Sequence, residues 1–469
     1  MIRKTKIIAT ISNKSCEPEF LERLYRAGVN IVRLNTAHMT HDDALKVIEN
    51  TRKVSEKIAI LIDTKGPEIR TCKADSPLAV KHGDLIRIKG DHTRQSHGDI
   101  IYVSYDNFVK DIPQGSSIMI DDGCIALAVM DKDDEFLYCH VENDGIIGEK
   151  KSINIPSVHV KLPALSSKDK GFIRFAQENN IDFIAHSFVR NKEDVIAVKN
   201  VLDKNKKKIK IIAKIENSDG VENLDEILDH AYGVMVARGD LAVEIPTEKI
   251  PLIQKQIVKK CIEKRSPVII ATQMLHTMIN SPRPTRAEVS DVANACLDHT
   301  DALMLSGETA SGKYPEEAVR TMASIANEVE LRTSSFMDVP YVSDNKITAY
   351  LAKAAVKASL RLNTKAILAD SMTGRSILEL AAYRGDNPIF AQVYNEETMR
   401  ELALSYGVYA NYFKRDENIL FPFERFVSKL LKEKRFFTDD LITVLAGHFD
   451  AVHGASYIEI AKAGDMMRL

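Results

Sequence analysis

A rhythm of short apolar segments and longer helical patterns constrains this chain more than any other feature. Eight segments are apolar enough to form buried strands, and most are followed by helical periodicity. They span residues 6–11, 30–35, 58–63, 181–187, 209–216, 232–237, 267–272 and 301–306. Eight such units predict an α/β fold whose parallel strands close into a (β/α)8 TIM barrel. A doubly wound open sheet is the alternative, because periodicity alone does not separate the two.

The third segment is followed by sequence of a different texture. Short strand-like pieces such as 85–88 and 118–120 are separated by turns such as Asp121-Asp122-Gly123, which predicts an inserted all-β domain. A connector, Asp338-Val339-Pro340, precedes a last stretch of mixed α/β pattern. The expected domains are a barrel over 1–69 and 166–342, a small β-barrel over 70–165, and a C-terminal α/β domain over 343–469.

Charge and composition exclude several classes of protein. Lysine and arginine number 64 against 66 acidic residues, and a net charge of −2 argues against nucleic-acid binding through bulk charge. No apolar run approaches the ~18 residues that cross a membrane, and the first residues lack the apolar core of a signal peptide. The six cysteines are scattered, which favours free thiols. We expect a cytoplasmic protein with no nucleic-acid or membrane partner.

Chemically capable side chains follow nearly every barrel segment. In a (β/α)8 barrel the active-site groups come from the carboxyl ends of the strands, which meet at one mouth. The residues at these ends are Arg33, Asn35, Asp63, Thr64, Lys65, Ser187, Lys214, Glu216, Arg238, Gly239, Asp240, Thr272, Gln273, Ser306 and Glu308. Strand ends are also polar simply because they meet water, but so many at once favour an active site.

Three of these residues point to a metal. Lys214 and Glu216 alternate along one strand and therefore face the same side, while Asp240 ends the next strand. Two nearby carboxylates repel each other unless a cation neutralises them, and Mg²⁺ or Mn²⁺ prefers such oxygen ligands. A buried salt bridge of Lys214 with Glu216 or Asp240 is the alternative.

Fixed positive charge around the mouth suggests phosphate chemistry. Arg33, Arg70 and Lys151 add to Lys214, and a divalent metal with arginine and lysine is the usual equipment for phosphoryl transfer. The chain contains neither GxxxxGK[ST] nor GxGxxG, so a P-loop or a Rossmann nucleotide site is not supported.

Long motifs now identify a family. They are KTKIIATI at 4–11, DTKGPEIR at 63–70, IAKIEN at 212–217, MVARGDL at 235–241, ATQML at 271–275, PRPTRAE at 282–288 and MLSGETA at 304–310. In this order they resemble the pyruvate kinase family over essentially the whole chain. The resemblance implies transfer of the phosphoryl group of phosphoenolpyruvate to ADP, which gives pyruvate and ATP.

The resemblance also implies roles for particular residues. Lys214, Arg33 and Thr272 would be catalytic, with Arg33 and Lys214 on the phosphoryl group and Thr272 beside the enolate. Substrate binding would also involve Ser187, Asp240 and the main chain at Ala237 and Gly239. Glu216 and Asp240 would hold Mg²⁺, and Asn35, Asp63 and Thr64 would hold K⁺. The nucleotide would meet Asn35, His38, Arg70 and Lys151.

The same resemblance implies regulation and assembly. The β insertion corresponds to a mobile lid and the C-terminal domain to an effector domain in a homotetramer. The loop at Ser371, Thr373, Gly374, Arg375 and Ser376 follows an apolar strand and opens a helix, so its backbone N–H groups converge. It is expected to bind the phosphate of a sugar-phosphate or nucleotide effector, with an ordinary helix cap as the alternative.

Several positions depart from the family pattern. Ala37 stands where serine is common, which removes one K⁺ ligand, and 12–15 replaces the usual Gly-Pro-Ala-Ser near the adenine contact. Asp144 and Ala242 replace glycines, and the tail lacks the usual Thr-Asn-Thr run. The departures at Ser12, Asn13 and Ala37 keep open a catalytically weak barrel that senses a sugar phosphate or nucleotide. A Mg²⁺-dependent lyase acting on pyruvate enolate is a second alternative, which loss of Arg70 and the lid would favour.

Overall fold

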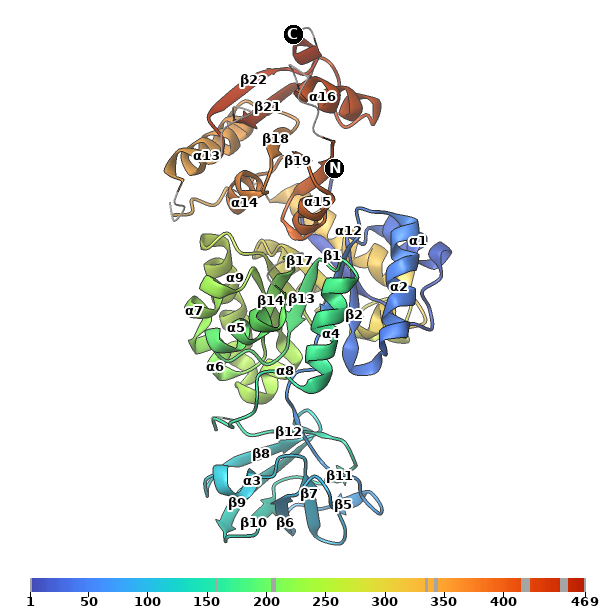
Figure 1. Ribbon diagram of the computed structural model, residues 1–469, viewed down its shortest axis with the longest axis vertical. Coiled ribbons are helices and arrows are strands. Elements are labelled where there is room, and N and C mark those ends of the chain that lie inside the picture. The colour runs from blue at the N-terminus through green and yellow to red at the C-terminus, as the bar shows by residue number, and fades with distance from the viewer. Residues whose placement is uncertain are drawn as a thin grey trace.

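Three bodies lie in a row along the molecule, with the barrel between the β insertion and the C-terminal domain (Figure 1). The computed structural model describes residues 2–156, 158–203, 208–333, 336–340, 345–414, 422–447 and 454–467. The boundary expected at 342/343 lies outside these residues. In the part of the chain so described, no helix combines the length and the apolar composition that spanning a membrane requires.

Eight parallel strands close into a barrel, which confirms the predicted fold and excludes the open sheet. In chain order they are β1 (Lys6–Thr10), β2 (Ile31–Asn35), β3 (Ala59–Asp63), β13 (Phe183–His186), β14 (Lys210–Ile215), β15 (Gly233–Ala237), β16 (Val268–Ala271) and β17 (Ala302–Leu305). β1 pairs with both β2 and β17, which completes the ring. The strands are mostly apolar because helices cover the outside and side chains fill the inside.

Helices surround the barrel and start soon after the strands end. They are α1 (Pro18–Ala27), α2 (His41–Val54), α4 (Ser167–Glu178), α5 (Lys192–Val201), α6 (Ser218–Glu222), α7 (Leu224–His230), α8 (Arg238–Glu244), α9 (Ile250–Glu263), α10 (Arg286–Leu297), α11 (Gly307–Ala310) and α12 (Pro315–Arg332). Capping boxes at Thr40, Ser166 and Thr285 bond the first turns of α2, α4 and α10. Such caps fix the loops that carry the mouth residues.

The insertion folds around an apolar core of its own. Its main sheet has the order β4 (Ile69–Arg70), β12 (Ser152–Asn154), β8 (Ser117–Ile120), β9 (Ile125–Lys132), β10 (Leu137–Val141), β6 (Leu85–Gly90) and β7 (Ile100–Val103). A bridge between Thr71 and Val103 joins the two ends of this sheet. The short strands β5 (Leu78–Val80) and β11 (Gly145–Ile147) form a second sheet, and α3 (Phe108–Asp111) is a single turn. We call this body the lid.

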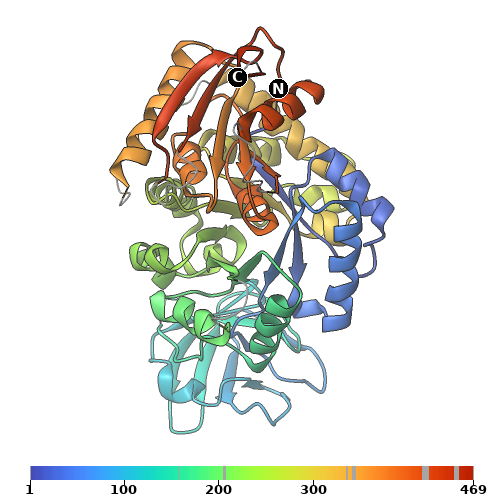
Figure 2. The same cartoon turned by 45° about the horizontal axis from the view of Figure 1, so that its top comes forward.

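The C-terminal domain is a five-stranded sheet with helices, as predicted. Its strand order is β20 (Val408–Tyr412), β19 (Ile389–Val393), β18 (Ile367–Ser371), β21 (Leu441–Ala446) and β22 (Tyr457–Lys462), and only β22 runs antiparallel. The accompanying helices are α13 (Lys346–Arg361), α14 (Arg375–Ala382), α15 (Glu396–Glu401) and α16 (Pro422–Lys432). In both views this domain lies across the barrel from the lid (Figures 1 and 2).

Buried ion pairs fasten the C-terminal domain to the barrel. Arg400 of α15 meets Asp182 at 2.8 Å, just before β13. Arg384 meets Asp301 at 2.6 Å, just before β17. Both contacts lie at the amino ends of barrel strands, so the C-terminal domain covers the barrel face opposite the mouth.

Candidate active site

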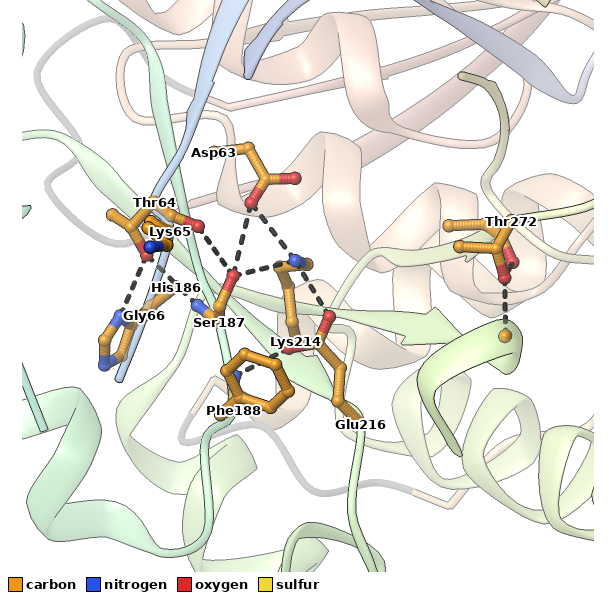
Figure 3. Close-up of polar contacts among 12 residues, drawn as sticks. Asp63, Thr64, Lys65, Gly66, His186, Ser187, Phe188, Lys214, Glu216 and Thr272 are labelled. Atoms are coloured by element: carbon orange, nitrogen blue, oxygen red, sulfur yellow. Dashed lines mark hydrogen bonds and ion pairs between the residues drawn. The ribbon is translucent and has the colours of Figure 1, made fainter. Parts of the chain in front are cut away.

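Lys214 lies at the centre of the mouth and is buried. Its ammonium donates to Ser187 Oγ at 2.8 Å and pairs with Glu216 at 2.8 Å and Asp63 at 3.2 Å (Figure 3). The salt bridge between Lys214 and Glu216 is therefore present, as one interpretation of the sequence expected. Burial lowers the pKa of Lys214, but the surrounding carboxylates raise it by more, so the ammonium stays charged.

Asp63 joins this lysine to a second cation. Arg33 pairs with the other oxygen of Asp63 at 2.7 Å and donates to Thr10 Oγ1 at 2.9 Å. Burial raises the pKa of Asp63, but Lys214 and Arg33 outweigh it and hold the pKa below its usual value. Asp63 of β3 thus links the cations of β2 and β14.

Glu216 and Asp240 carry the negative charge that a metal would neutralise. Glu216 accepts from Lys214 and from Phe188 N–H at 2.6 Å. Burial and the neighbouring carboxylates raise the pKa of both carboxyls even with Lys214 nearby, so keeping both of them ionised would call for a further cation. Such a donor set fits a hard divalent cation. No group of three or more His, Cys, Asp or Glu side chains converges among the described residues, so other ligands would come from substrate and water.

Thr272 lies to one side of the Lys214 cluster (Figure 3), at the end of β16, which is separated from β14 by β15. Its hydroxyl donates to Ala271 O at 2.7 Å and accepts from Gly239 N–H at 2.8 Å. The predicted catalytic threonine therefore touches the backbone that the family pattern assigns to the substrate carboxylate.

The predicted K⁺ residues lie beside the lysine cluster. Thr64 Oγ1 is 3.2 Å from His186 Nδ1, and Ser187 Oγ donates to Thr64 O at 2.7 Å. Asn35 accepts from Ala37 N–H at 3.1 Å, one turn beyond β2. Burial lowers the pKa of His186 to about 4, so a neutral imidazole supports this loop. Sequence reasoning missed His186, whose only signal was its place one residue before Ser187.

The two lid cations predicted to meet the nucleotide are held in ion pairs of their own. Arg70 pairs with Glu68 at 2.7 Å, and Lys151 pairs with Asp121 at 2.8 Å. Both cations are more than one-third exposed, and His38 is exposed beyond β2. In the described parts of the chain, no hydrogen bond or ion pair joins either lid cation to Lys214.

A cavity separates the lid from this side of the barrel. Its volume is about 130 Å³. Among the residues that line it are Glu68, Asp122, Phe188, Asp240 and Glu244. The lid cations Arg70 and Lys151 would have to cross this space to reach a nucleotide at the mouth.

The predicted effector loop has features of a phosphate-binding site and of an ordinary helix cap. Ser371 Oγ accepts from Gly374 N–H at 2.9 Å, which is a cap-like bond. Gly374 has a φ of 80°, and Thr373 and Arg375 are exposed where α14 begins. Burial raises the pKa of the neighbouring Asp370 to about 6. The loop therefore presents a basic and a hydroxyl side chain to solvent, with a carboxyl group next to them.

Fold and mouth together define a class. A (β/α)8 barrel that holds buried lysine, arginine and two carboxylates with raised pKa is suited to a metal-dependent enzyme acting on a phosphorylated anion. Residues 2–319 match the family description "Pyruvate kinase, barrel domain", and residues 350–461 match "Pyruvate kinase, alpha/beta domain". The chain belongs to the pyruvate kinase family, and its function is that of a pyruvate kinase.

Individual relatives agree with this assignment. A pyruvate kinase of Borreliella burgdorferi is 46% identical over 100% of this chain and 99% of its own length. One of Sporosarcina psychrophila is 41% identical over 95% of this chain and 78% of its own length. The crystal structure of a pyruvate kinase from Cryptosporidium parvum superposes with a TM-score of 0.92 at 34% identity, covering 98% of this chain and 96% of the other.

Proposed function

We propose that the barrel mouth transfers the phosphoryl group of phosphoenolpyruvate to ADP. The observation that carries this proposal is the buried Lys214, which is charged and flanked by Arg33, Asp63 and Glu216. Lys214 and Arg33 would neutralise the phosphoryl oxygens and the enolate oxygen as charge develops. The main chain at Ala237 and Gly239 would bind the carboxylate, and Ser187 would orient the lysine through its 2.8 Å bond.

Glu216 and Asp240 would hold Mg²⁺ or Mn²⁺. When bound, the ion would polarise the phosphoryl and enolate oxygens as a Lewis acid. A coupled assay of pyruvate formation from phosphoenolpyruvate and ADP, with and without Mg²⁺, tests the whole assignment. A lyase or a sensor would form no pyruvate in this assay, and intact Lys214 and Thr272 argue against the sensor.

Closure of the lid would complete the nucleotide site. Arg70 and Lys151 would exchange Glu68 and Asp121 for the phosphates of ADP, while Asn35 and His38 would meet the nucleotide from the barrel side. Phosphates would compete well because both existing ion pairs are partly exposed to solvent and therefore weak. Closure would also exclude water from the enolate.

Thr272→Ala is expected to impair protonation of the enolate more than phosphoryl transfer. The hydroxyl is the side-chain group at the end of β16 that can orient the proton donor, and one such group contributes about 10²-fold. Exchange of the methyl protons of pyruvate with solvent reports protonation, and ATP formation reports transfer. An equal loss in both rates would contradict the separate role.

K⁺ is expected to activate the enzyme through Asn35, Asp63 and Thr64. Glu68, between β3 and β4, adds negative charge and cannot replace a cation as a lysine could. Ala37→Ser should restore one ligand and lower the K⁺ needed for half activation by roughly 3- to 10-fold, the worth of one polar contact of about 1 kcal/mol. Glu68→Lys should reduce the dependence on K⁺.

The K⁺ prediction is measured in tetramethylammonium buffer, with KCl titrated at constant ionic strength. Alanine leaves space for a water molecule at position 37, so the wild type should respond, but weakly. Full activity of the wild type without K⁺ would refute this account.

An effector at Ser371, Thr373, Gly374, Arg375 and Ser376 is the regulatory part of the proposal. A sugar phosphate or nucleotide would place a phosphate at the start of α14. Thr373→Glu is expected to abolish activation without affecting basal turnover, because the side chain is exposed and far from the mouth. Activation curves with fructose 1,6-bisphosphate, glucose 6-phosphate and AMP measure this. Unchanged activation by an effector that activates the wild type would favour the ordinary cap.

A homotetramer would carry the effector signal between mouths. β22 lies at the edge of the C-terminal sheet with Tyr457 41% exposed, and an open edge can pair with a second copy. Analytical ultracentrifugation tests the subunit count. A cytoplasmic location stays a prediction.

A further inference from the structure

Thr272 has a backbone conformation that needs support. Its φ is 67°, and the next residue, Gln273, has a φ of 52°. Left-handed conformations are rare for residues other than glycine, and a β-branched residue in this region is a genuine outlier. Such strain persists only where surrounding contacts hold it. The contacts that hold Thr272 therefore decide where its hydroxyl points.

Arg238 supplies the main contact. One end of its guanidinium donates to Thr272 O at 2.9 Å and lies 2.9 Å from Met274 Sδ. The other end pairs with Asp291 of α10 at 2.6 Å. The arginine side chain is only 13% exposed, and its Nε has no hydrogen-bond partner within the described part of the chain. The buried fork thus bridges α10 and the turn after β16.

The order of the barrel strands explains why Arg238 can reach Thr272. Ala237 at the end of β15 lies opposite Ala271 at the end of β16. Arg238 and Thr272, the first residues after these two strands, are therefore neighbours. Gly239 N–H donates to Thr272 Oγ1 at 2.8 Å while Arg238 donates to Thr272 O. Two consecutive residues therefore hold the hydroxyl and the carbonyl of one threonine.

A carboxylate completes the turn from the far side. Glu308 accepts from Leu275 N–H at 3.1 Å and from Ser306 N–H at 2.8 Å, and it is buried. The turn is thus held at Thr272 O by the guanidinium of Arg238 and at Leu275 N–H by the carboxylate of Glu308. Asp291, which is 36% exposed, acts by orienting the guanidinium.

We propose that Arg238, oriented by Asp291, is a positioning residue that holds Thr272 for delivery of a proton to the enolate. This inference rests on the proposed role of Thr272. Arg238 would not touch substrate. It would fix the left-handed turn that aims the Thr272 hydroxyl, and the same contact would keep Gly239 N–H in register with that hydroxyl. A misplacement of about 1 Å at such a group can cost 10²-fold in rate.

Arg238→Lys and Asp291→Asn test the proposal. Lysine keeps the charge but lacks the planar fork that reaches Thr272 O and Asp291 together. Arg238→Lys is expected to slow exchange of the pyruvate methyl protons by about 10- to 100-fold, with a smaller loss in ATP formation and little change in KM for phosphoenolpyruvate. Asp291→Asn should show the same pattern more weakly. Arg320→Lys, which alters an exposed pair with Glu316, is the matched control and should change neither rate.

Rescue separates positioning from a general loss of structure. Arg238→Ala should regain methyl exchange when guanidinium ion is added at a low, non-denaturing concentration, and methylammonium should not replace it. Normal methyl exchange in Arg238→Lys, or an equal loss in both rates without rescue of Arg238→Ala, would overturn the proposal. If Thr272→Ala leaves methyl exchange unchanged, the role of Thr272 fails. If Thr272→Ala loses it and Arg238→Lys does not, only the positioning role fails.

Discussion

Glu216→Gln and Asp240→Asn are each expected to lower turnover by about 10³-fold or more at ordinary Mg²⁺. On the proposed assignment each change removes one of the two carboxylate ligands of the metal, and a Lewis-acid metal is worth several kcal/mol in such reactions. Each 1.4 kcal/mol corresponds to a factor of ten in rate. The measurement is turnover over a Mg²⁺ and a Mn²⁺ titration. Full activity in either variant would sink the metal assignment.

Glu244→Gln is the matched control for this prediction. Glu244 lies one turn after Asp240 on α8 and lines the same cavity, and burial raises its pKa to about 7. We place no metal on it, so its loss should leave the Mg²⁺ dependence unchanged. If Glu244→Gln shifted the Mg²⁺ requirement as much as Asp240→Asn does, the ion would be attracted by the summed negative charge of the cleft and not by direct coordination to Asp240.

Asp240→Asn is expected to lose activity without losing folding stability in the absence of metal. Burial raises the pKa of Glu216 and Asp240, so in the absence of metal their ionised forms oppose folding. The stability contributed by the protonated forms is present below the ordinary carboxyl pKa and is lost as pH rises through the raised values. Asp240→Asn should therefore be at least as stable as the wild type at pH 8 without metal, whereas Glu216→Gln also removes a partner of the buried Lys214. A large loss of stability would mean that inactivity reflects unfolding.

The barrel could be predicted because each strand is a short run in which apolar residues predominate. The expected segment 6–11 became Lys6–Thr10, and 58–63 became Ala59–Asp63. A parallel strand buried on both faces leaves this local signature regardless of its neighbours. The strand order of the lid could not be predicted in this way. Its strands β6 and β7 pair in parallel, and nothing in the pattern of either segment shows which strand it pairs with.

The centre of the site could be predicted for a similar reason. Alternation along a strand placed Lys214 and Glu216 on one side, and the 2.8 Å contact between them agrees. The contact of Lys214 with Asp63 depends on the spatial order of the barrel strands, which brings β13 between β14 and β3. Arg238 ended a predicted strand, but sequence gave no direction for its side chain. The contact with Asp291, more than fifty residues later, exists only in the folded barrel.

Arg400→Met is expected to destabilise the docking of the C-terminal domain by about 3 kcal/mol. Arg400 and Asp182 are 6% and 0% exposed in their side chains and meet at 2.8 Å. Loss of one partner of a buried pair leaves a charge that the protein interior solvates poorly, and this typically costs 3–5 kcal/mol. Arg52 at 3.1 Å and Ile60 N–H at 2.9 Å still hold Asp182, which keeps the expected loss at the lower end.

Arg332→Met is the matched control, because Arg332 pairs with Glu328 at 2.6 Å on the exposed face of α12. Exposed pairs one helical turn apart contribute about 0.3–0.5 kcal/mol, so this variant should unfold almost as the wild type does. Urea unfolding followed by circular dichroism, together with proteolysis of the segment between α12 and α13, measures both variants. Earlier cleavage and a lower midpoint in Arg400→Met alone are expected, since only this change uncouples α15 from the barrel. Equal behaviour of the two variants would mean that apolar packing, and not the buried pair, holds the C-terminal domain against the amino ends of the barrel strands.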